Sequence, residues 1–189
     1  ELLIGIGTAE EMLSDWPGGA IRFRREDGQI SRAKFKLLEA ERTFGLRLDA
    51  HERALDIGAA PGGWTSLLLE RGLDVTAIDP ANLHPSLVGH PRVTWIKRNA
   101  GDVSFAPGTF DLLVCDMSWD PATMAKLVLR LAPSLKAGAE AIVTVKLLHR
   151  KPMQTIRNVT EQLGQVFDIR RAKQLFHNRD EITLYLICR

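Results

Sequence analysis

The sequence predicts an α/β fold with a mostly parallel, seven-stranded sheet, a terminal antiparallel hairpin and helices on both faces. Three observations indicate this fold. Short apolar runs alternate with helical patterns, the last two runs have no helix between them, and no repeat or low-complexity tract divides the chain. Because open parallel sheets bind ligands beyond the carboxyl ends of their strands, we expect the functional site there.

The first part of the chain holds a lead-in and one helix. We expect residues 1–30 to precede or pack on the main domain, which spans residues 31–189, with a short helix over 8–13 and a short strand over 20–25. A helix is predicted over 31–44, because Ser31 can cap it and Phe35, Leu38 and Phe44 recur at helical spacing. The sequence begins at Glu1 rather than Met, so we expect it to be a fragment that lacks an upstream domain.

Each later element has its own local signal. Gly72 ends a predicted helix, Asp120 and Pro121 open another, and Gly138 separates the latter helix from the strand that follows it. The expected strands cover 53–57, 73–78, 92–96, 110–115, 140–145, 166–172 and 182–187. The expected helices cover 64–71, 120–131 and 152–163.

Composition narrows the class of protein. Of the 189 residues, 45% are hydrophobic and 25% charged, and no apolar run approaches the roughly 20 residues that a membrane helix needs. Cys115 and Cys188 lie in apolar runs and are expected to be reduced, buried thiols. We therefore expect a cytoplasmic protein without membrane contact, and a monomer is the favoured state.

A glycine-rich loop follows the first predicted strand. Its spacing is Gly58-x-x-x-Gly62-Gly63, with Pro61 suited to the first turn of the next helix. Such a loop holds a nucleotide-like ligand at a helix N-terminus. Because dinucleotide enzymes use Gly-x-Gly-x-x-Gly instead, the spacing favours S-adenosylmethionine over a nicotinamide cofactor.

Polar residues end several of the predicted strands: Asp56, Asp79, Asn99, Asp116 and Lys146. Any one of them is commonplace, since loops begin there, but their joint occurrence points to a site. Asp79 has the separation from the loop at which a carboxylate meets a ribose. Lys146 follows a buried run and is either a satisfied strand-end charge or a functional amine, and the second reading is favoured.

Two basic segments flank the predicted cofactor loop in sequence. They could form one phosphate-binding face or simply be solvated surface. Their members are Arg22, Arg24, Arg25, Arg32, Lys34 and Lys36 in the first, and His149, Arg150, Lys151, Arg170, Arg171 and Lys173 in the second.

The tract Ser31-Arg32-Ala33-Lys34-Phe35-Lys36-Leu37, together with Asp56-Ile57-Gly58-Ala59-Ala60-Pro61-Gly62-Gly63-Trp64, resembles the FtsJ-type ribose 2′-O-methyltransferases. The resemblance covers most of the chain from about Trp16, and it is strongest to members that act on bacterial large-subunit ribosomal RNA. It implies a Rossmann-like methyltransferase fold, S-adenosyl-L-methionine as cofactor and RNA as substrate. Carried over residue by residue, the family's catalytic tetrad falls on Lys36, Asp116, Lys146 and Glu181, with Lys146 as proton acceptor.

The resemblance also implies a cofactor-binding set. Where the family has an aspartate after the third strand to meet the adenine, this sequence has Asn99, with Asp102 three residues later, and either can substitute. The predicted cofactor residues are Ser31, Gly58, Ala60, Pro61, Gly62, Gly63, Trp64, Asp79, Asn99 and Asp116.

Other readings remain open from the sequence. Trp64 suits packing beside the loop better than RNA stacking, and His177 could orient Glu181 or contact phosphate. His149 and His177 have no partners at metal-ligand spacing, so no metal is expected. A catalytically silent RNA-binding module is the alternative function, and an oxidoreductase is disfavoured by the loop spacing.

Overall fold

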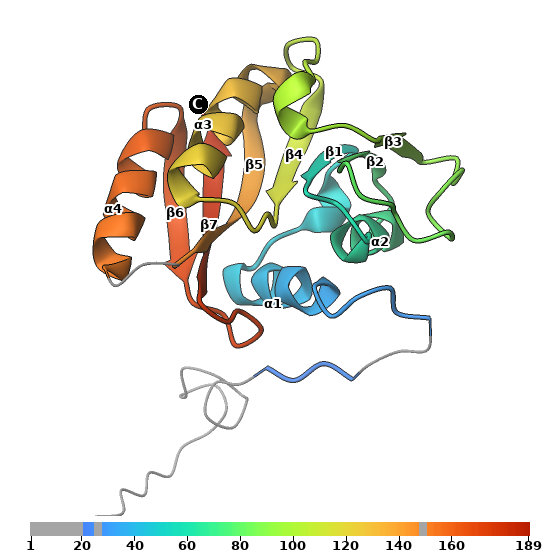
Figure 1. The fold of residues 1–189 in the computed structure, drawn as a ribbon, viewed down its shortest axis with the longest axis horizontal. Helices are drawn as coiled ribbons and strands as arrows, with labels where there is room; N and C mark the ends of the chain where they lie inside the picture. The colour runs from blue at the N-terminus through green and yellow to red at the C-terminus, as the bar shows by residue number, and fades with distance from the viewer. Residues whose placement is uncertain (1–20, 25–27, 148–150) are drawn as a thin grey trace, which may run out of the picture.

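The computed structural model describes residues 21–24, 28–147 and 151–189, and its strands end close to the residues predicted from the sequence (Figure 1). The predicted helix over 8–13 lies outside the described residues. The strands are β1 Arg53–Ile57, β2 Asp74–Ile78, β3 Val93–Ile96, β4 Phe110–Cys115, β5 Leu135–Lys146, β6 Phe167–Lys173 and β7 Glu181–Cys188.

One sheet contains all seven of these strands, in the order β3-β2-β1-β4-β5-β7-β6. The five strands from β3 to β5 run parallel, whereas β7 is antiparallel to both of its neighbours. The predicted fold class is therefore confirmed, and β6 and β7 form the predicted hairpin. Its second strand, β7, inserts beside β5.

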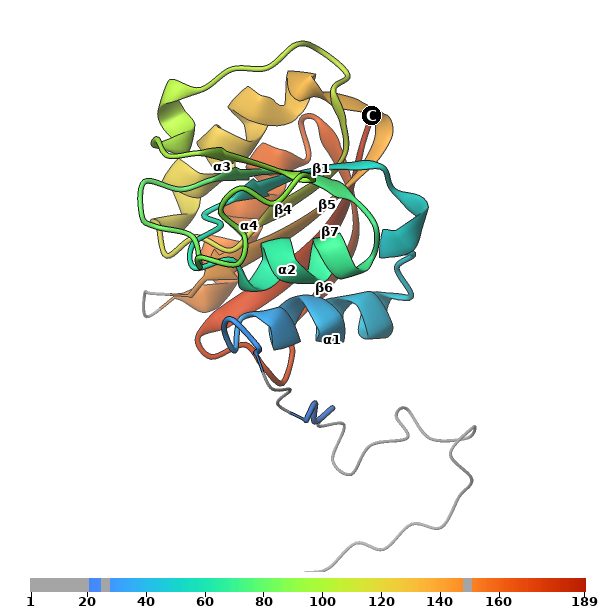
Figure 2. The same ribbon diagram turned by 90° about the vertical axis from the view of Figure 1, so that its right-hand side faces the viewer.

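Two helices cover each face of the sheet. The helices are α1 Lys34–Phe44, α2 Gly63–Glu70, α3 Pro121–Leu131 and α4 Pro152–Leu163. Figure 2 shows α1 and α2 together in front of the sheet, and their apolar sides share a core that includes Leu37 and Leu67. The cluster around Leu113 and Val128 fills the face under α3 and α4. No helix in the described part of the chain has the length and hydropathy to span a membrane.

Three local predictions differ from the structure. Residues 21–24 form no strand. Ser31 does not cap α1, whose N-cap is Ala33 without a side-chain hydrogen bond. The strand expected over 140–145 begins at Leu135, and Gly138, with φ +79°, lies inside it where the pairing with β4 shifts register. A glycine can take this conformation within a strand. Gly138 therefore allows a bulge inside β5, where we expected it to precede the strand. Asp120 does cap α3, accepting from Thr123 N at 3.0 Å.

The loop after β1 depends on residues without a Cβ. Gly58 has φ +77°, and its N–H donates to the Ile78 carbonyl at 3.0 Å, which ties the loop to the end of β2. A Cβ on Gly58 would lie 2.6 Å from Met117 Cγ. Gly62, with φ +114°, is the N-cap of α2. The chain therefore needs glycine here both for its left-handed backbone and for close packing.

Asp56 lies beneath this loop as a buried carboxylate. It is 1% exposed, and Thr65 Oγ1 donates to its Oδ2 at 2.6 Å. Burial raises the pKa of Asp56 to about 7, the charges of Asp116 and Asp79 add to the rise, and the Thr65 hydrogen bond opposes it. Between about pH 4 and pH 7, the folded protein therefore holds a proton on Asp56 that the unfolded chain releases.

We expect Asp56→Asn to flatten the pH dependence of stability. Because the folded pKa of Asp56 lies above its unfolded value of 3.8, the stability that its proton contributes is complete below about pH 4 and is lost as pH rises to about 7. Urea unfolding of wild type and Asp56→Asn across this window measures the difference. An unchanged slope in the variant would contradict the buried acid.

Gly58→Ala and Gly89→Ala form a matched pair for the loop. The two glycines have φ of +77° and +78°, so alanine adds the same left-handed strain of about 1–2 kcal/mol at each. A Cβ on Gly89 meets nothing within 4 Å, whereas one on Gly58 meets Met117. We expect Gly58→Ala to lower the free energy of unfolding by about 1–3 kcal/mol more than Gly89→Ala in urea titrations. Equal losses would show that close packing adds nothing.

Candidate active site

A cleft of about 260 Å³ opens beyond the carboxyl ends of β1, β2 and β4. Five of the predicted cofactor residues line it, which are Gly58, Ala60, Asp79, Asn99 and Asp116. The sequence reasoning missed the segment directly after β4, where Met117, Ser118 and Trp119 form another wall. Its signal was available, because the segment follows a buried strand in the same way as the glycine loop.

Asp79 lines the cleft and accepts hydrogen bonds from the backbone of two segments beside it. Its Oδ2 accepts from Ala60 N at 3.1 Å and its Oδ1 accepts from Ala81 N at 2.8 Å. Each carboxylate oxygen can accept a further hydrogen bond. Of the two residues predicted as alternatives after the third strand, Asn99 lines the same cleft, whereas Asp102 does not.

The remaining predicted cofactor residues do not line this cleft. They are Ser31, Pro61, Gly62, Gly63 and Trp64. Trp64 is 3% exposed and its Nε1 donates to the Ala33 carbonyl at 2.8 Å, as expected for a packing role. A nucleoside with a sulfonium side chain suits the cleft, because carboxylate, amide and apolar groups converge beside a glycine that leaves room for close approach.

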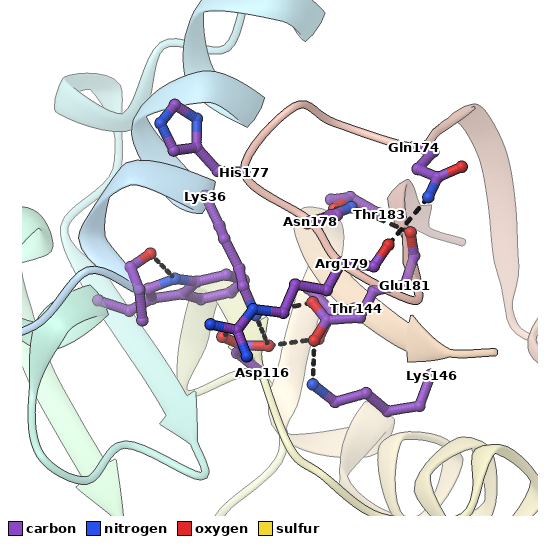
Figure 3. Close-up of polar contacts among 12 residues, drawn as sticks. Lys36, Asp116, Thr144, Lys146, Gln174, His177, Asn178, Arg179, Glu181 and Thr183 are labelled. Carbon is purple, nitrogen blue, oxygen red and sulfur yellow. Dashed lines mark hydrogen bonds and ion pairs between the residues drawn. The ribbon is translucent and has the colours of Figure 1, made fainter. Parts of the chain in front are cut away.

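The four predicted catalytic residues meet in one cluster (Figure 3). Lys36 Nζ lies 3.1 Å from Asp116 Oδ2 and 2.7 Å from Glu181 Oε2, and Lys146 Nζ forms an ion pair with Glu181 Oε1. Thr144 Oγ1 also donates to Asp116 Oδ1 at 2.7 Å. We refer to Lys36, Asp116, Lys146 and Glu181 as the tetrad.

Four elements position the tetrad. Lys36 lies in the first turn of α1, Asp116 directly follows β4, and Lys146 ends β5. Glu181 begins β7 and is the registered partner of Lys146 in the antiparallel pairing. Residues distant in sequence therefore meet because β4, β5 and β7 are neighbours in the sheet.

Opposite charges favour the ionised forms of Lys36 and Glu181. Burial disfavours the Lys36 ammonium, but the charge of Asp116 and the hydrogen bond to Glu181 outweigh it and raise the pKa of Lys36. Burial likewise opposes ionisation of Glu181, but hydrogen bonds from Lys146 and Lys36 lower its pKa. Lys36 is thus held as a cation between two carboxylates.

A second hollow of about 690 Å³ lies on the other side of Lys36 and Glu181. The exposed side chains of Arg22, Arg32 and Arg179 line it, together with aromatic side chains, and we call it the basic hollow. Only part of the predicted basic face is therefore found here. Lys34 is buried and pairs with Glu70 at 2.8 Å. Lys151, Arg170, Arg171 and Lys173 do not line the hollow. Arg25, His149 and Arg150 lie outside the described residues.

The structure shows the surroundings of His177 and of both cysteines. His177 Nδ1 lies 2.8 Å from Glu39 Oε2, so its ring pairs with Glu39 where an interaction with Glu181 was one expectation. Cys115 and Cys188 are free and buried, as predicted. Within residues 21–24, 28–147 and 151–189, no group of three or more His, Cys, Asp or Glu side chains is arranged to hold a metal ion.

Several known proteins are similar to this chain in sequence or in fold. The ribosomal RNA large subunit methyltransferase M of Halorhodospira halophila is 40% identical over 185 residues, covering 96% of this chain and 52% of that protein. The protein of the same name from Laribacter hongkongensis is 35% identical over 186 residues, covering 90% and 51%. This chain therefore spans about half the length of the curated relatives that it matches.

Similarity to solved structures extends the fold comparison. The 1,6-didemethyltoxoflavin-N1-methyltransferase of Burkholderia thailandensis, solved with S-adenosylhomocysteine, superposes with a TM-score of 0.64 at 14% identity, covering 86% of this chain and 81% of that one. The model of the FtsJ-like methyltransferase family matches residues 29–188, which confirms the resemblance seen in the tracts Ser31–Leu37 and Asp56–Trp64. This chain belongs to the FtsJ-like methyltransferase family.

Proposed function

We propose that this chain transfers a methyl group from S-adenosylmethionine to a ribose 2′-hydroxyl of RNA. One observation carries the proposal: members of the tetrad line both cavities. Asp116 lines the cleft beside the glycine loop, while Lys36 and Glu181 line the basic hollow. A donor in the cleft and an acceptor in the hollow would meet at the tetrad, which is the arrangement that an in-line displacement requires.

S-adenosylmethionine, the cofactor of this methyltransferase family, supplies a methyl group already activated by its sulfonium. Asp79 and Asn99 would hold the nucleoside part, and Gly58 and Met117 line the same cleft. The remaining chemical task of the protein is to orient the ribose and to remove the proton of a weakly acidic hydroxyl.

Lys146 is the amine best suited to take that proton. Lys36 is committed as a cation, because it lies between Asp116 and Glu181 and its pKa is raised. Lys146 pairs with Glu181 alone among the described residues. In the proposed reaction Lys146 Nζ first releases its own ammonium proton and then accepts the 2′-hydroxyl proton, and Glu181 stabilises the ammonium that forms again.

The names of the relatives support ribosomal RNA as the substrate. The exposed arginines of the basic hollow suit phosphate contacts, which position RNA without reading its sequence. Because ribosomal RNA is made and modified in the bacterial cytoplasm, we also propose a cytoplasmic location. Residues 31–189 would then form the catalytic domain, preceded by the lead-in.

We expect Lys146→Ala to lower kcat for RNA methylation by about 10²–10⁴-fold, the usual contribution of a positioned general base. The dissociation constant for S-adenosylhomocysteine should stay near that of wild type, since Lys146 does not line the cofactor cleft. The measurements are methyl incorporation into ribosomal RNA from a strain lacking the gene and calorimetric titration of the cofactor product.

Lys136→Ala is the matched control. Lys136 lies in the same strand as Lys146, is well exposed and pairs with Asp111 at 3.2 Å. The activity of this variant should therefore equal that of wild type. Full turnover by Lys146→Ala would remove Lys146 as the base. Binding of the cofactor by wild type without methylation of any ribosomal RNA would favour the silent RNA-binding module instead.

A further inference from the structure

Phe176 is an exposed aromatic side chain at the edge of the basic hollow. It lies in the β6–β7 connection, 52% of its surface is exposed, and it shares the lining of the hollow with Lys36 and Glu181. A single exposed apolar residue is common on protein surfaces, but this ring lies in the lining of the basic hollow, where a ligand could contact it.

The backbone that carries Phe176 is firmly held. Glu39, 2% exposed on α1, accepts from Phe176 N at 2.7 Å and from His177 N at 2.8 Å. The same carboxylate lies 2.8 Å from His177 Nδ1. The exposure of Phe176 is therefore a property of an anchored loop, since each contact joins the loop to α1.

The ring of Phe176 packs against a cluster of other rings. Its ring centroid lies 5.2 Å from that of His177 at an interplanar angle of 90°. The His177 ring lies in turn 5.4 Å from both Phe23 and Phe35, and those two rings stack at 5.7 Å. The supporting side of Phe176 is thus fixed, and its exposed surface adjoins the hollow.

Positive charge surrounds this aromatic surface. Arg22, Arg32 and Arg179 line the same hollow. Figure 3 shows the Arg179 side chain extending toward Lys36 and Asp116. Aromatic rings interleaved with exposed arginines are the combination by which proteins bind single-stranded nucleic acid, with bases stacked on rings and phosphates held by cations.

We propose that Phe176 is a stacking platform for an unpaired RNA base at, or directly beside, the nucleotide that is methylated. Arg22, Arg32 and Arg179 hold the flanking phosphates. Stacking on Phe176 requires a base that has left its own helix, so the site selects unpaired RNA. This inference rests on the proposed function, because it places the RNA in the basic hollow.

The test combines protein and RNA changes. The probe is a short oligoribonucleotide that spans the methylated position, mapped first by mass spectrometry on ribosomal RNA. We expect Phe176→Leu to raise the KM for this RNA about tenfold, the loss expected for one base–aromatic stack. The kcat and the affinity for S-adenosylhomocysteine should not change, and Phe176→Trp should restore the KM.

Abasic substitutions in the RNA identify the stacked base. An abasic residue at the methylated position or at one of its two neighbours should weaken binding to wild type about tenfold, as measured by fluorescence anisotropy, yet add little to the loss in Phe176→Leu. Met153→Ala is the control, because Met153 is 75% exposed on α4 and does not line the hollow. It should leave the KM unchanged.

Two results would overturn the inference while leaving the proposed function intact. One is an unchanged RNA KM in Phe176→Leu with wild-type methylation present. The other is that, at all three abasic positions, the loss of affinity from the abasic RNA adds in full to the loss from Phe176→Leu. That result would show that Phe176 does not contact a base there. A wild-type protein that methylates no ribosomal RNA would instead remove the proposed function, and the stacking platform with it. Urea unfolding of each variant separates these outcomes from misfolding.

Discussion

The ion pair of Lys36 with Asp116 and Glu181 is the constraint on which the site depends. All three side chains are mostly shielded from water, so each charge needs its partners. Loss of one partner from such a buried set typically costs about 3–5 kcal/mol, because it leaves an uncompensated charge. Helix α1, the end of β4 and the start of β7 must therefore dock together, and the Thr144 hydrogen bond to Asp116 adds β5 to the same arrangement.

The position of β7 turns this constraint into a proposed catalytic geometry. Glu181 and Lys146 are opposite one another only because β7 inserts antiparallel between β5 and β6, in the register that runs from Glu140 and Ile187 to this pair. A slip of one residue would turn the alternating side chains of β7 to the other face of the sheet. Burial of Leu184 and Leu186 opposes such a slip, so core packing places Lys146, the proposed proton acceptor, beside Glu181.

The sequence predicts the parallel part of the structure well, because each strand carries its own apolar run and ends in a polar residue. By the same reasoning it places Asp116 and Lys146 among the strand-end residues of one site, while Lys36 and Glu181 were assigned to that site only from a family resemblance. Spacing cannot show that β7 lies beside β5, because antiparallel insertion is a property of the whole sheet. It also cannot show that Glu39 anchors the loop at Phe176, since that contact spans 137 residues.

Helix α1 links the parts of the proposed site. Its N-cap residue, Ala33, accepts the Trp64 indole N–H at the start of α2, which connects it to the glycine loop. Lys36, in the first turn of α1, reaches the other members of the tetrad. Glu39, three residues further on the same side of the helix, holds the loop that carries Phe176. The glycine loop, the tetrad and the basic hollow thus all contact α1, so displacement of α1 would disturb all three together.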